Sequence, residues 1–273
     1  MNIAILGSTG SIGHSTLEVI RQNKKDFLIN LLTAKTNHKL LIEQCEEFNP
    51  EFVYLEDEQA RKILESNLLH KKLQTSVIQS LKEFEEIIGS NDTDVVVAGM
   101  VGIAGLIPVH FAIQKGKKVL LANKESYVVA GEYLNNLCKE TGATIFPIDS
   151  EHSAIHQCLN NEANKSGVSR IILTGSGGPF LNKDIEEFSS ITPEQAINHP
   201  VWNMGKKISV DSSTMMNKGL EVIEARWLFD SDNIEILIHP EGIIHSLVEF
   251  KDNSVLAQLS NPDMKIPIAY GLG

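Results

Sequence analysis

The chain has 273 residues, of which 42% are hydrophobic and 22% are charged, and its formal net charge is −11. This composition is typical of a globular protein, and the length allows two domains. The acidic balance disfavours a general nucleic-acid binder, which needs a basic face, but it allows a local basic pocket for a phosphorylated metabolite.

Cysteine usage and hydropathy indicate the compartment. Cys45, Cys138 and Cys158 are odd in number and form no CxxC pattern, which favours a reducing environment with buried or free thiols. No apolar run reaches membrane-spanning length, and "MNIAILG" leads straight into a strand without a charged leader. We therefore expect a cytoplasmic protein with no membrane partner.

The first predicted elements are a short strand, a glycine-rich turn and a helix. Gly7, Gly10 and Gly13 punctuate the turn. The first permits a tight turn, the second lets the backbone approach a pyrophosphate, and the third lets the helix pack close to the strand. Backbone N–H groups at the helix start would then face the phosphates. In this context the pattern favours a dinucleotide site over an ordinary βα turn.

The end of the second predicted strand, residues 27–34, indicates which coenzyme binds. A site that prefers NAD places an acid there to bind the ribose 2′-hydroxyl. This strand instead runs into "KTNHK", which has Lys35 and Lys39 and no acid. A 2′-phosphate suits such a loop, so we infer NADP(H). A solvated basic loop is the alternative.

Strands and amphipathic helices keep alternating through residues 1–148. Short apolar runs between such helices predict a Rossmann-like, doubly wound parallel sheet covered on both faces. Ligands bind these sheets beyond the carboxyl ends of the strands, where "GMVGIAGL", "ANKES" and "DSEHS" fall. Lys124 could orient a substrate near the nicotinamide, or it could belong to a polar cluster that starts a helix.

The pattern changes to a predicted α+β catalytic domain over residues 149–273. "SRIILTGSGGPF" predicts a strand that ends in a Gly/Ser turn. "KISVDSSTMMNKGLEVIEARWLF" predicts a strand, a polar turn and a helix. "GIIHSLVEFKDNSVLAQLS" alternates apolar and polar residues around "KDN", which predicts an antiparallel hairpin.

Three acids of this half suggest a metal site. Asp149 and Glu151 flank Ser150 at the end of a buried strand, and Glu221 follows Asn217 by four residues, on the same helical face. Such an all-oxygen site suits Mg²⁺ or Mn²⁺ rather than Zn²⁺. Without a metal the acids would repel one another. In the alternative, Asp149 caps a helix and Glu221 is a surface residue, which leaves Glu151 unexplained.

The polar turns of the second half also carry groups that suit a phosphate. These are Ser176, Ser212, Ser213, Asn217 and Lys218. Residues 198–207 form a predicted loop in which Trp202 stands with His199, Met204 and Gly205. An aromatic residue in such a loop is consistent with a lid that excludes water.

Several long motifs carry a family resemblance. They are "GSTGSIG", "LANKES", "PIDSEHSAI", "TGSGGPF", "HPVWNMGKKISVDSSTMMNKGLEVIEARWLF" and "PDMKIP". Together, and in order along the chain, they resemble the 1-deoxy-D-xylulose 5-phosphate reductoisomerase family. The resemblance implies an NADPH- and divalent-metal-dependent enzyme of non-mevalonate isoprenoid biosynthesis, typically a homodimer and inhibited by fosmidomycin. It also leads us to expect that the family's helical C-terminal domain is absent from this chain.

The resemblance implies a role for each matching residue. The implied metal ligands are Asp149, Glu151 and Glu221. The implied substrate contacts are Lys124, Ser150, Ser176, His199, Ser212, Asn217 and Lys218. The implied NADPH contacts are Gly7, Thr9, Gly10, Ser11, Ile12, Asn123, Glu125 and Gly205, with Lys35 and Asn37 near the 2′-phosphate.

The implied reaction converts 1-deoxy-D-xylulose 5-phosphate to 2-C-methyl-D-erythritol 4-phosphate. The carbon skeleton rearranges, and NADPH reduces the resulting aldehyde. One alternative is another NADP-linked oxidoreductase without rearrangement, such as a semialdehyde dehydrogenase-like protein. Such a protein needs a catalytic cysteine between its domains, and Cys158 lies near the junction but in a predicted helical stretch rather than a strand-turn setting. The other is a chain that binds NADPH without turnover.

Overall fold

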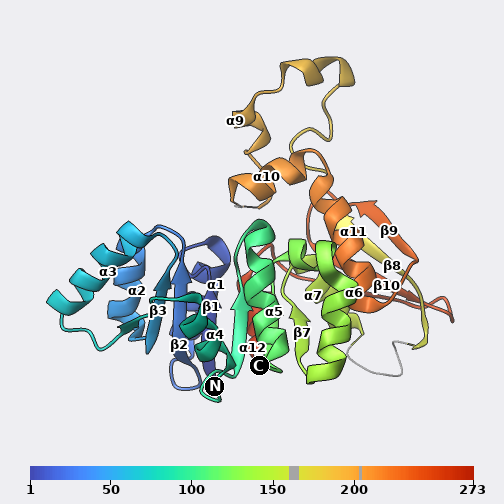
Figure 1. Cartoon of the computed structure of the whole chain (residues 1–273). Helices are drawn as coiled ribbons and strands as arrows, with labels where there is room; N and C mark the ends of the chain where they lie inside the picture. The colour runs from blue at the N-terminus through green and yellow to red at the C-terminus, as the bar shows by residue number, and fades with distance from the viewer. Residues whose placement is uncertain (160–165, 203–204) are drawn as a thin grey trace. The chain divides into compact units, whose positions relative to one another are not determined.

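The computed structural model describes residues 1–159, 166–202 and 205–273. The chain forms two compact units (Figure 1), of which unit 1 comprises Met1–Phe146 and Ile268–Gly273 and unit 2 comprises Pro147–Pro267. In the described ranges, no helix is both long and apolar enough to cross a membrane.

Unit 1 is built from strands and helices in alternation. Its elements are β1 (Asn2–Leu6), α1 (Ser11–Gln22), β2 (Leu28–Ala34), α2 (His38–Phe48), β3 (Phe52–Leu55), α3 (Glu58–His70), β4 (Ser76–Val77), α4 (Leu81–Gly89), β5 (Val95–Ala98), the 3₁₀ helix η1 (Gly102–Gly105), α5 (Leu106–Gln114), β6 (Lys118–Leu121), α6 (Lys124–Thr141) and β7 (Thr144–Pro147). The last helix of the chain, α12 (Lys265–Leu272), begins in unit 2 and ends in unit 1.

The seven strands form one sheet in the order β4-β3-β2-β1-β5-β6-β7, and β1 to β6 pair in parallel. The order runs outward from β1 and then resumes at β5 on its other side, which confirms the predicted doubly wound sheet. The central strands are apolar throughout, and Ile3, Ile5, Val96 and Val97 have no exposed surface. A strand covered on both faces requires this composition.

The chain reverses its direction across the sheet between β1 and β5, where such folds bind ligands. Gly7 follows β1 with a φ of +82°, a left-handed conformation that favours glycine. A Cβ atom on Gly7 would lie 3.1 Å from the carbonyl oxygen of Gly99, which follows β5. The two glycine turns therefore meet at the carboxyl ends of these strands.

Unit 2 contains a second, smaller sheet. Its elements are α7 (Ser150–Cys158), β8 (Val168–Gly175), the 3₁₀ helix η2 (Ile185–Ser190), α9 (Pro193–Ala196), α10 (Lys206–Ser213), α11 (Met216–Phe229), β9 (Ile234–Ile238), β10 (Ile244–Phe250) and β11 (Val255–Leu259). The strand order is β11-β10-β8-β9. β10 runs antiparallel to both β8 and β11, which confirms the predicted hairpin.

Helices α7 and α11 contribute to one apolar core with this sheet. Ile155 of α7 and Ala225 of α11 join Ile171, Leu173 and Val248 of β8 and β10, and none of these five residues is exposed. Burial of this apolar surface fixes both helices in unit 2. The polar side chains at their starts are therefore held in place by the core.

The strand predicted at the start of "KISVDSS" is wrong, because residues 206–213 form the helix α10. The β-branched residues Ile208 and Val210 suggested a strand, but in the structure they belong to a helix that starts after Gly205. Nζ of Lys207 lies 2.6 Å from Oδ2 of Asp211, an i,i+4 pair that supports a helix.

Candidate metal and substrate site

Two of the predicted metal ligands lie where β7 passes into α7. Asp149 is the N-cap residue of α7, and its Oδ1 accepts a hydrogen bond of 3.1 Å from the backbone N–H of Ser150. Glu151 lies in the first turn, and the hydroxyl of Ser150 donates to its carboxylate. Asp149 therefore does cap α7, as the alternative interpretation expected. This cap does not involve Glu151, whose carboxylate contacts Ser150 and Lys218.

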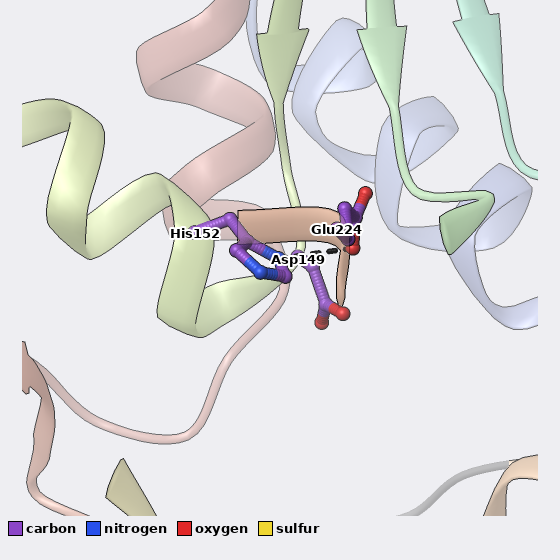
Figure 2. Close-up of side chains that lie close together, drawn as sticks. All are labelled: Asp149, His152 and Glu224. Atoms are coloured by element: carbon purple, nitrogen blue, oxygen red, sulfur yellow. Dashed lines mark ion pairs between the residues drawn. The ribbon is translucent and has the colours of Figure 1, made fainter. Parts of the chain in front are cut away.

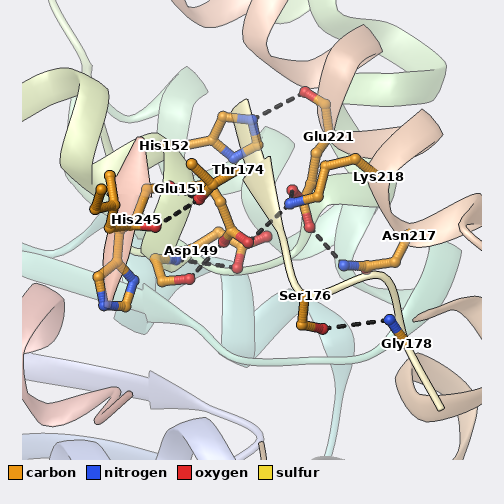
Figure 3. A network of polar contacts seen from close by, with 12 residues as sticks. Asp149, Glu151, His152, Thr174, Ser176, Gly178, Asn217, Lys218, Glu221 and His245 are labelled. Atoms are coloured by element: carbon orange, nitrogen blue, oxygen red, sulfur yellow. Dashed lines mark hydrogen bonds and ion pairs between the residues drawn. The ribbon is translucent and has the colours of Figure 1, made fainter. Parts of the chain in front are cut away.

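The third acid comes from α11 and completes an acidic cluster. One ligand oxygen each of Asp149, Glu151 and Glu221 lies within 4.8 Å of the others. Figure 3 shows these acids together with Lys218, whose Nζ lies 2.8 Å from Oε1 of Glu151 and also donates to Glu221. The side chain of Glu221 is only 1% exposed, so the alternative of a surface residue is wrong.

The electrostatics of the cluster favour a divalent cation. Burial alone would lower the pKa of Lys218, but the charges of Glu151 and Glu221 outweigh it and hold this pKa above its ordinary value. Three carboxyl groups gathered around one ammonium concentrate acidic side chains in a partly desolvated site, where charges interact strongly. Carboxylate oxygens are also the ligands that Mg²⁺ and Mn²⁺ prefer. The residues present therefore fit such an ion.

Two further contacts fix the polar face of α11. The side-chain amide of Asn217 donates to Oε1 of Glu221, and the two residues share one helical face as their four-residue spacing predicted. The stem of Lys218 crosses Gly175 at the end of β8, where an added Cβ would lie 2.9 Å from Cε of the lysine. Gly175 thus leaves the space that Lys218 occupies.

His199 and Ser176 form a second polar group of unit 2. Nδ1 of His199 accepts hydrogen bonds from the backbone N–H groups of Val201 and Trp202, at 3.1 and 2.9 Å. The proton therefore sits on Nε2, which donates to Oγ of Ser176 at 3.1 Å. Burial lowers the pKa of His199, although the charge of Glu151 acts in the opposite direction. The ring is thus set up as a neutral donor.

The loop after Ser176 packs against the end of α10. A Cβ on Gly178 would lie 2.7 Å from the carbonyl oxygen of Ser212. Met215, between α10 and α11, has a φ of +62°, a strained conformation for a residue with a side chain. Such strain is common at functional sites, and here it lies two residues before Asn217.

The predicted lid loop is described only in part, because Met204 lies outside the described residues. Trp202 contacts His245 edge to face, with ring centroids 5.9 Å apart. Gly205 is the N-cap residue of α10 and belongs to unit 2, unlike the other predicted NADPH residues.

The predicted coenzyme residues of unit 1 lie at the carboxyl ends of its strands. Gly10 is the N-cap residue of α1, and Thr9, Ser11 and Ile12 adjoin it. Asn123 caps α6 by accepting from the backbone N–H of Ser126, and its amide donates to the carbonyl oxygens of Met100 and Gly102. Lys124 and Glu125 form the first turn of α6, and Lys124 is only 6% exposed.

Lys35 and Asn37 lie in the loop after β2. Lys35 is exposed. Asn37 caps α2, and its Oδ1 accepts from the backbone N–H of Leu40 at 3.2 Å. The amide N–H groups of Asn37 are the part of this side chain that suits a phosphate.

Two buried residues beside the acidic cluster, His152 and Glu224, were not predicted. Nδ1 of His152 lies 3.1 Å from Oε2 of Glu224 (Figure 2). A signal was present in the sequence, because Lys218, Glu221 and Glu224 recur every three residues and so share one face of a helix. A helix face with three charged side chains must either be exposed to solvent or be buried against polar partners.

A dinucleotide-binding fold together with a partly buried carboxylate cluster defines a class of coenzyme-linked enzymes with a candidate metal centre. A family model described as 1-deoxy-D-xylulose 5-phosphate reductoisomerase matches residues 3–131, and the model of that family's C-terminal domain matches residues 145–229. The chain belongs to the 1-deoxy-D-xylulose 5-phosphate reductoisomerase family.

Relatives of the same name agree along nearly the whole chain. The reductoisomerase of Glaesserella parasuis is 52% identical over 98% of this chain and 70% of the relative's length. That of Haemophilus ducreyi is 51% identical over 98% of this chain and 71% of its own length. The chain therefore spans about 70% of these relatives.

Solved structures give the same result. A reductoisomerase in complex with NADPH, fosmidomycin and magnesium superposes with a TM-score of 0.95, at 44% identity over 100% of this chain and 69% of the other. The Zymomonas mobilis reductoisomerase in complex with NADPH has a TM-score of 0.89, at 42% identity over 99% of this chain and 70% of the other. The resemblance and the predicted fold class are thus confirmed, and the alternative of another NADP-linked oxidoreductase without rearrangement is not supported.

Proposed function

We propose that the chain catalyses the NADPH- and divalent-metal-dependent conversion of 1-deoxy-D-xylulose 5-phosphate to 2-C-methyl-D-erythritol 4-phosphate in non-mevalonate isoprenoid biosynthesis. Membership of the reductoisomerase family supports this reaction. The observation that carries it is the cluster of Asp149, Glu151 and Glu221, whose ligand oxygens lie within 4.8 Å of one another. Unit 1 is the proposed coenzyme domain, and unit 2 the proposed catalytic domain.

Asp149, Glu151 and Glu221 would hold Mg²⁺ or Mn²⁺. A structural neighbour of this family was solved with magnesium, NADPH and fosmidomycin, which supports both cofactors. A divalent ion bound here supplies Lewis-acid polarisation of the substrate's carbonyl and hydroxyl oxygens. Ser150, placed between two of these acids, is the proposed contact to those oxygens.

The remaining polar groups of unit 2 are proposed to bind the phosphorylated substrate. They are Ser176, His199, Ser212, Asn217 and Lys218, with Lys124 of unit 1 as a further contact. The ammonium of Lys218 and the Nε2–H of His199 are donors that suit phosphate or hydroxyl oxygens. Phosphate binding away from the reacting carbons lowers the barrier by orienting them.

The turn after β1 is the proposed pyrophosphate site for NADPH. Gly10 has no side chain that could cap α1, so the first N–H groups of this helix suit phosphate oxygens. The proposed contacts are Gly7, Thr9, Gly10, Ser11, Ile12, Asn123, Glu125 and Gly205. Lys35 and Asn37 are proposed for the 2′-phosphate.

A homodimer is proposed as the assembly. β9 and β11 are the edge strands of the second sheet. Leu237, Val255 and Leu259 on these strands are between 47% and 56% exposed. Exposed apolar side chains on sheet edges mark an interaction surface or an aggregation hazard, and a second copy would cover them. Sedimentation measurements would test this proposal.

The cytoplasm is the proposed compartment. Cys45, Cys138 and Cys158, all of which the structure describes, form no disulfide, as a reducing environment favours.

The reaction is tested by product analysis. The chain is incubated with 1-deoxy-D-xylulose 5-phosphate, NADPH and Mn²⁺ or Mg²⁺, with EDTA as control, and products are identified by NMR. We expect the branched tetritol phosphate, formed with the metal and not with EDTA. Oxidation of NADPH without carbon rearrangement would favour an ordinary oxidoreductase. Binding of NADPH without turnover would contradict the proposal.

A further inference from the structure

His152 and Glu224 form a buried polar pair beside the acidic cluster (Figure 2). Their side chains are 0% and 1% exposed, and Nδ1 of His152 lies 3.1 Å from Oε2 of Glu224. The histidine comes from α7 and the glutamate from α11. Polar groups this deeply buried carry a desolvation cost that only good partners offset, so the pair calls for a specific role.

The other edge of the imidazole contacts the backbone of a proposed metal ligand. Nε2 of His152 lies 2.9 Å from the carbonyl oxygen of Glu221 (Figure 3). A carbonyl oxygen can only accept, so Nε2 carries the proton and donates. On its other edge, Nδ1 faces Oε2 of Glu224 at 3.1 Å.

Packing further restricts the histidine. Its ring lies 6.2 Å from the ring of Phe229, centroid to centroid, near the end of α11. The ring is thus held by Glu224, by the Glu221 carbonyl and by Phe229, all on α11. On its own chain, His152 directly follows Glu151. One side chain therefore connects the turn that carries Glu151 to the backbone that carries Glu221.

We propose that His152 and Glu224 are positioning residues of the metal site, and this inference rests on the proposed function. The Nε2–H bond fixes the backbone of Glu221, and Glu224 fixes the ring. The carboxylates of Glu151 and Glu221 are thereby kept at the separation that one cation requires. Hydrogen-bonded partners behind the ligands of metal sites commonly act in this way.

Asp149, His152 and Glu224 also place one ligand atom each within 4.8 Å, so this trio could itself hold a metal ion. The contacts favour positioning, because Nε2 of His152 is engaged by the backbone carbonyl of Glu221 and Nδ1 lies 3.1 Å from Oε2 of Glu224. The all-carboxylate cluster also matches the preference of Mg²⁺ and Mn²⁺ for oxygen better than a histidine-containing trio.

The test measures Mn²⁺ binding directly, by the electron paramagnetic resonance signal of the free ion. His152→Gln keeps an amide donor near the position of Nε2, and His152→Asn keeps one only near Nδ1. We expect the Kd for Mn²⁺ to rise at least about tenfold in His152→Asn, as for other outer-shell changes, and to stay within about threefold in His152→Gln. Glu224→Gln, whose amide can donate to Nδ1, should resemble the wild type, and Glu224→Ala should resemble His152→Asn.

Binding of NADPH to each variant, and its melting curve, control for folding. Equal Mn²⁺ affinity in His152→Asn and the wild type would overturn this inference alone, as would equal losses in both His152 variants. A wild-type chain that binds no Mn²⁺, or binds it unchanged in Glu221→Gln, would overturn the proposed metal site and this inference with it.

Discussion

Lys218 and Glu151 form an ion pair between two helices of unit 2, with Nζ of the lysine 2.8 Å from Oε1 of the glutamate. Their side chains are 5% and 16% exposed. Lys218 also donates to Glu221, so one ammonium links acids from α7 and α11. Because Lys218 contacts both acids, a shift of its ammonium would disturb the whole cluster. Salt screens such a buried contact only weakly.

Gly175→Ala should weaken substrate binding by displacing Lys218. The new Cβ would lie 2.9 Å from Cε of the lysine, and this buried side chain has little room to move. We expect KM for the substrate to rise about tenfold, with NADPH affinity unchanged. Gly219→Ala is the matched control, since its Cβ meets only Sδ of Met216 at 3.8 Å. Steady-state kinetics in which both variants match the wild type would contradict this role of Gly175.

Gly13→Ala should push α1 away from β1. Its Cβ would lie 2.4 Å from both Cα and the carbonyl oxygen of Ser8, and backbone atoms cannot yield as a flexible side chain does. We expect a loss of about 1–3 kcal/mol in the free energy of unfolding, as for other overpacked sites, together with weaker NADPH binding.

Gly10→Ala is the comparison for this test. Its nearest contact would be the carbonyl oxygen of Gly7 at 3.3 Å, so its loss of stability should be smaller. Urea unfolding of both variants measures the difference. Equal stability losses would mean that close packing at Gly13 is not the reason for a glycine there.

Lys35→Glu should reduce the preference for NADPH over NADH. The exposed loop after β2 carries no acid next to Lys35, and a carboxylate there would repel a 2′-phosphate. We expect the ratio of kcat/KM for NADPH to that for NADH to fall at least about tenfold, the effect of roughly 1.4 kcal/mol. Lys25→Glu makes the same charge change in an exposed turn before β2 and should leave the ratio intact. An unchanged ratio in Lys35→Glu would place the 2′-phosphate elsewhere.

Cys45 should make the stability of the protein fall at alkaline pH. Burial, with a smaller contribution from the charge of Glu46, raises the pKa of this thiol from 9.0 to about 12. Between these values the unfolded chain releases the proton and the folded chain keeps it. The free energy of unfolding therefore falls as the pH rises, by at most about 1.4 kcal/mol per pH unit from this group.

Cys45→Ala removes that contribution, so its stability should depend less on pH above 9.0 than that of the wild type. Urea unfolding on both sides of this pH measures the two slopes. Parallel pH profiles would show that the thiol ionises as readily in the folded protein as in the unfolded chain.

The sequence predicted the fold where local and long-range requirements agree. Glycines between an apolar strand and a helix indicated the nucleotide-binding fold, because this order of strand, glycine turn and helix is typical of it. The structure shows the reason at Gly7, whose φ is +82°. The proposed metal ligands were grouped together because Asp149 and Glu151 follow a buried strand, where an acid needs a partner. Ile208 and Val210 suggested a strand because β-branched residues favour strands. The segment instead forms a helix, in which Lys207 and Asp211 make an i,i+4 ion pair.

His152 and Glu224 were beyond the sequence for a different reason. The two residues lie 72 positions apart in the sequence. The hydrogen bond that carries the proposed role runs from His152 to the backbone carbonyl of Glu221. A backbone acceptor leaves no trace in the residue types. Spacing alone indicated that α11 has a charged face, but it could not show that this face is buried against a histidine.

The most direct test of the central claim is turnover of 1-deoxy-D-xylulose 5-phosphate, followed by NADPH absorbance, in the wild type and in Glu151→Gln. Glu187→Gln, an exposed acid of the same unit, is the matched control. We predict turnover that requires Mn²⁺ or Mg²⁺, is abolished by EDTA, is lost in Glu151→Gln with NADPH binding intact, and survives in Glu187→Gln. Turnover that neither EDTA nor Glu151→Gln affects would contradict a metal site built from Asp149, Glu151 and Glu221.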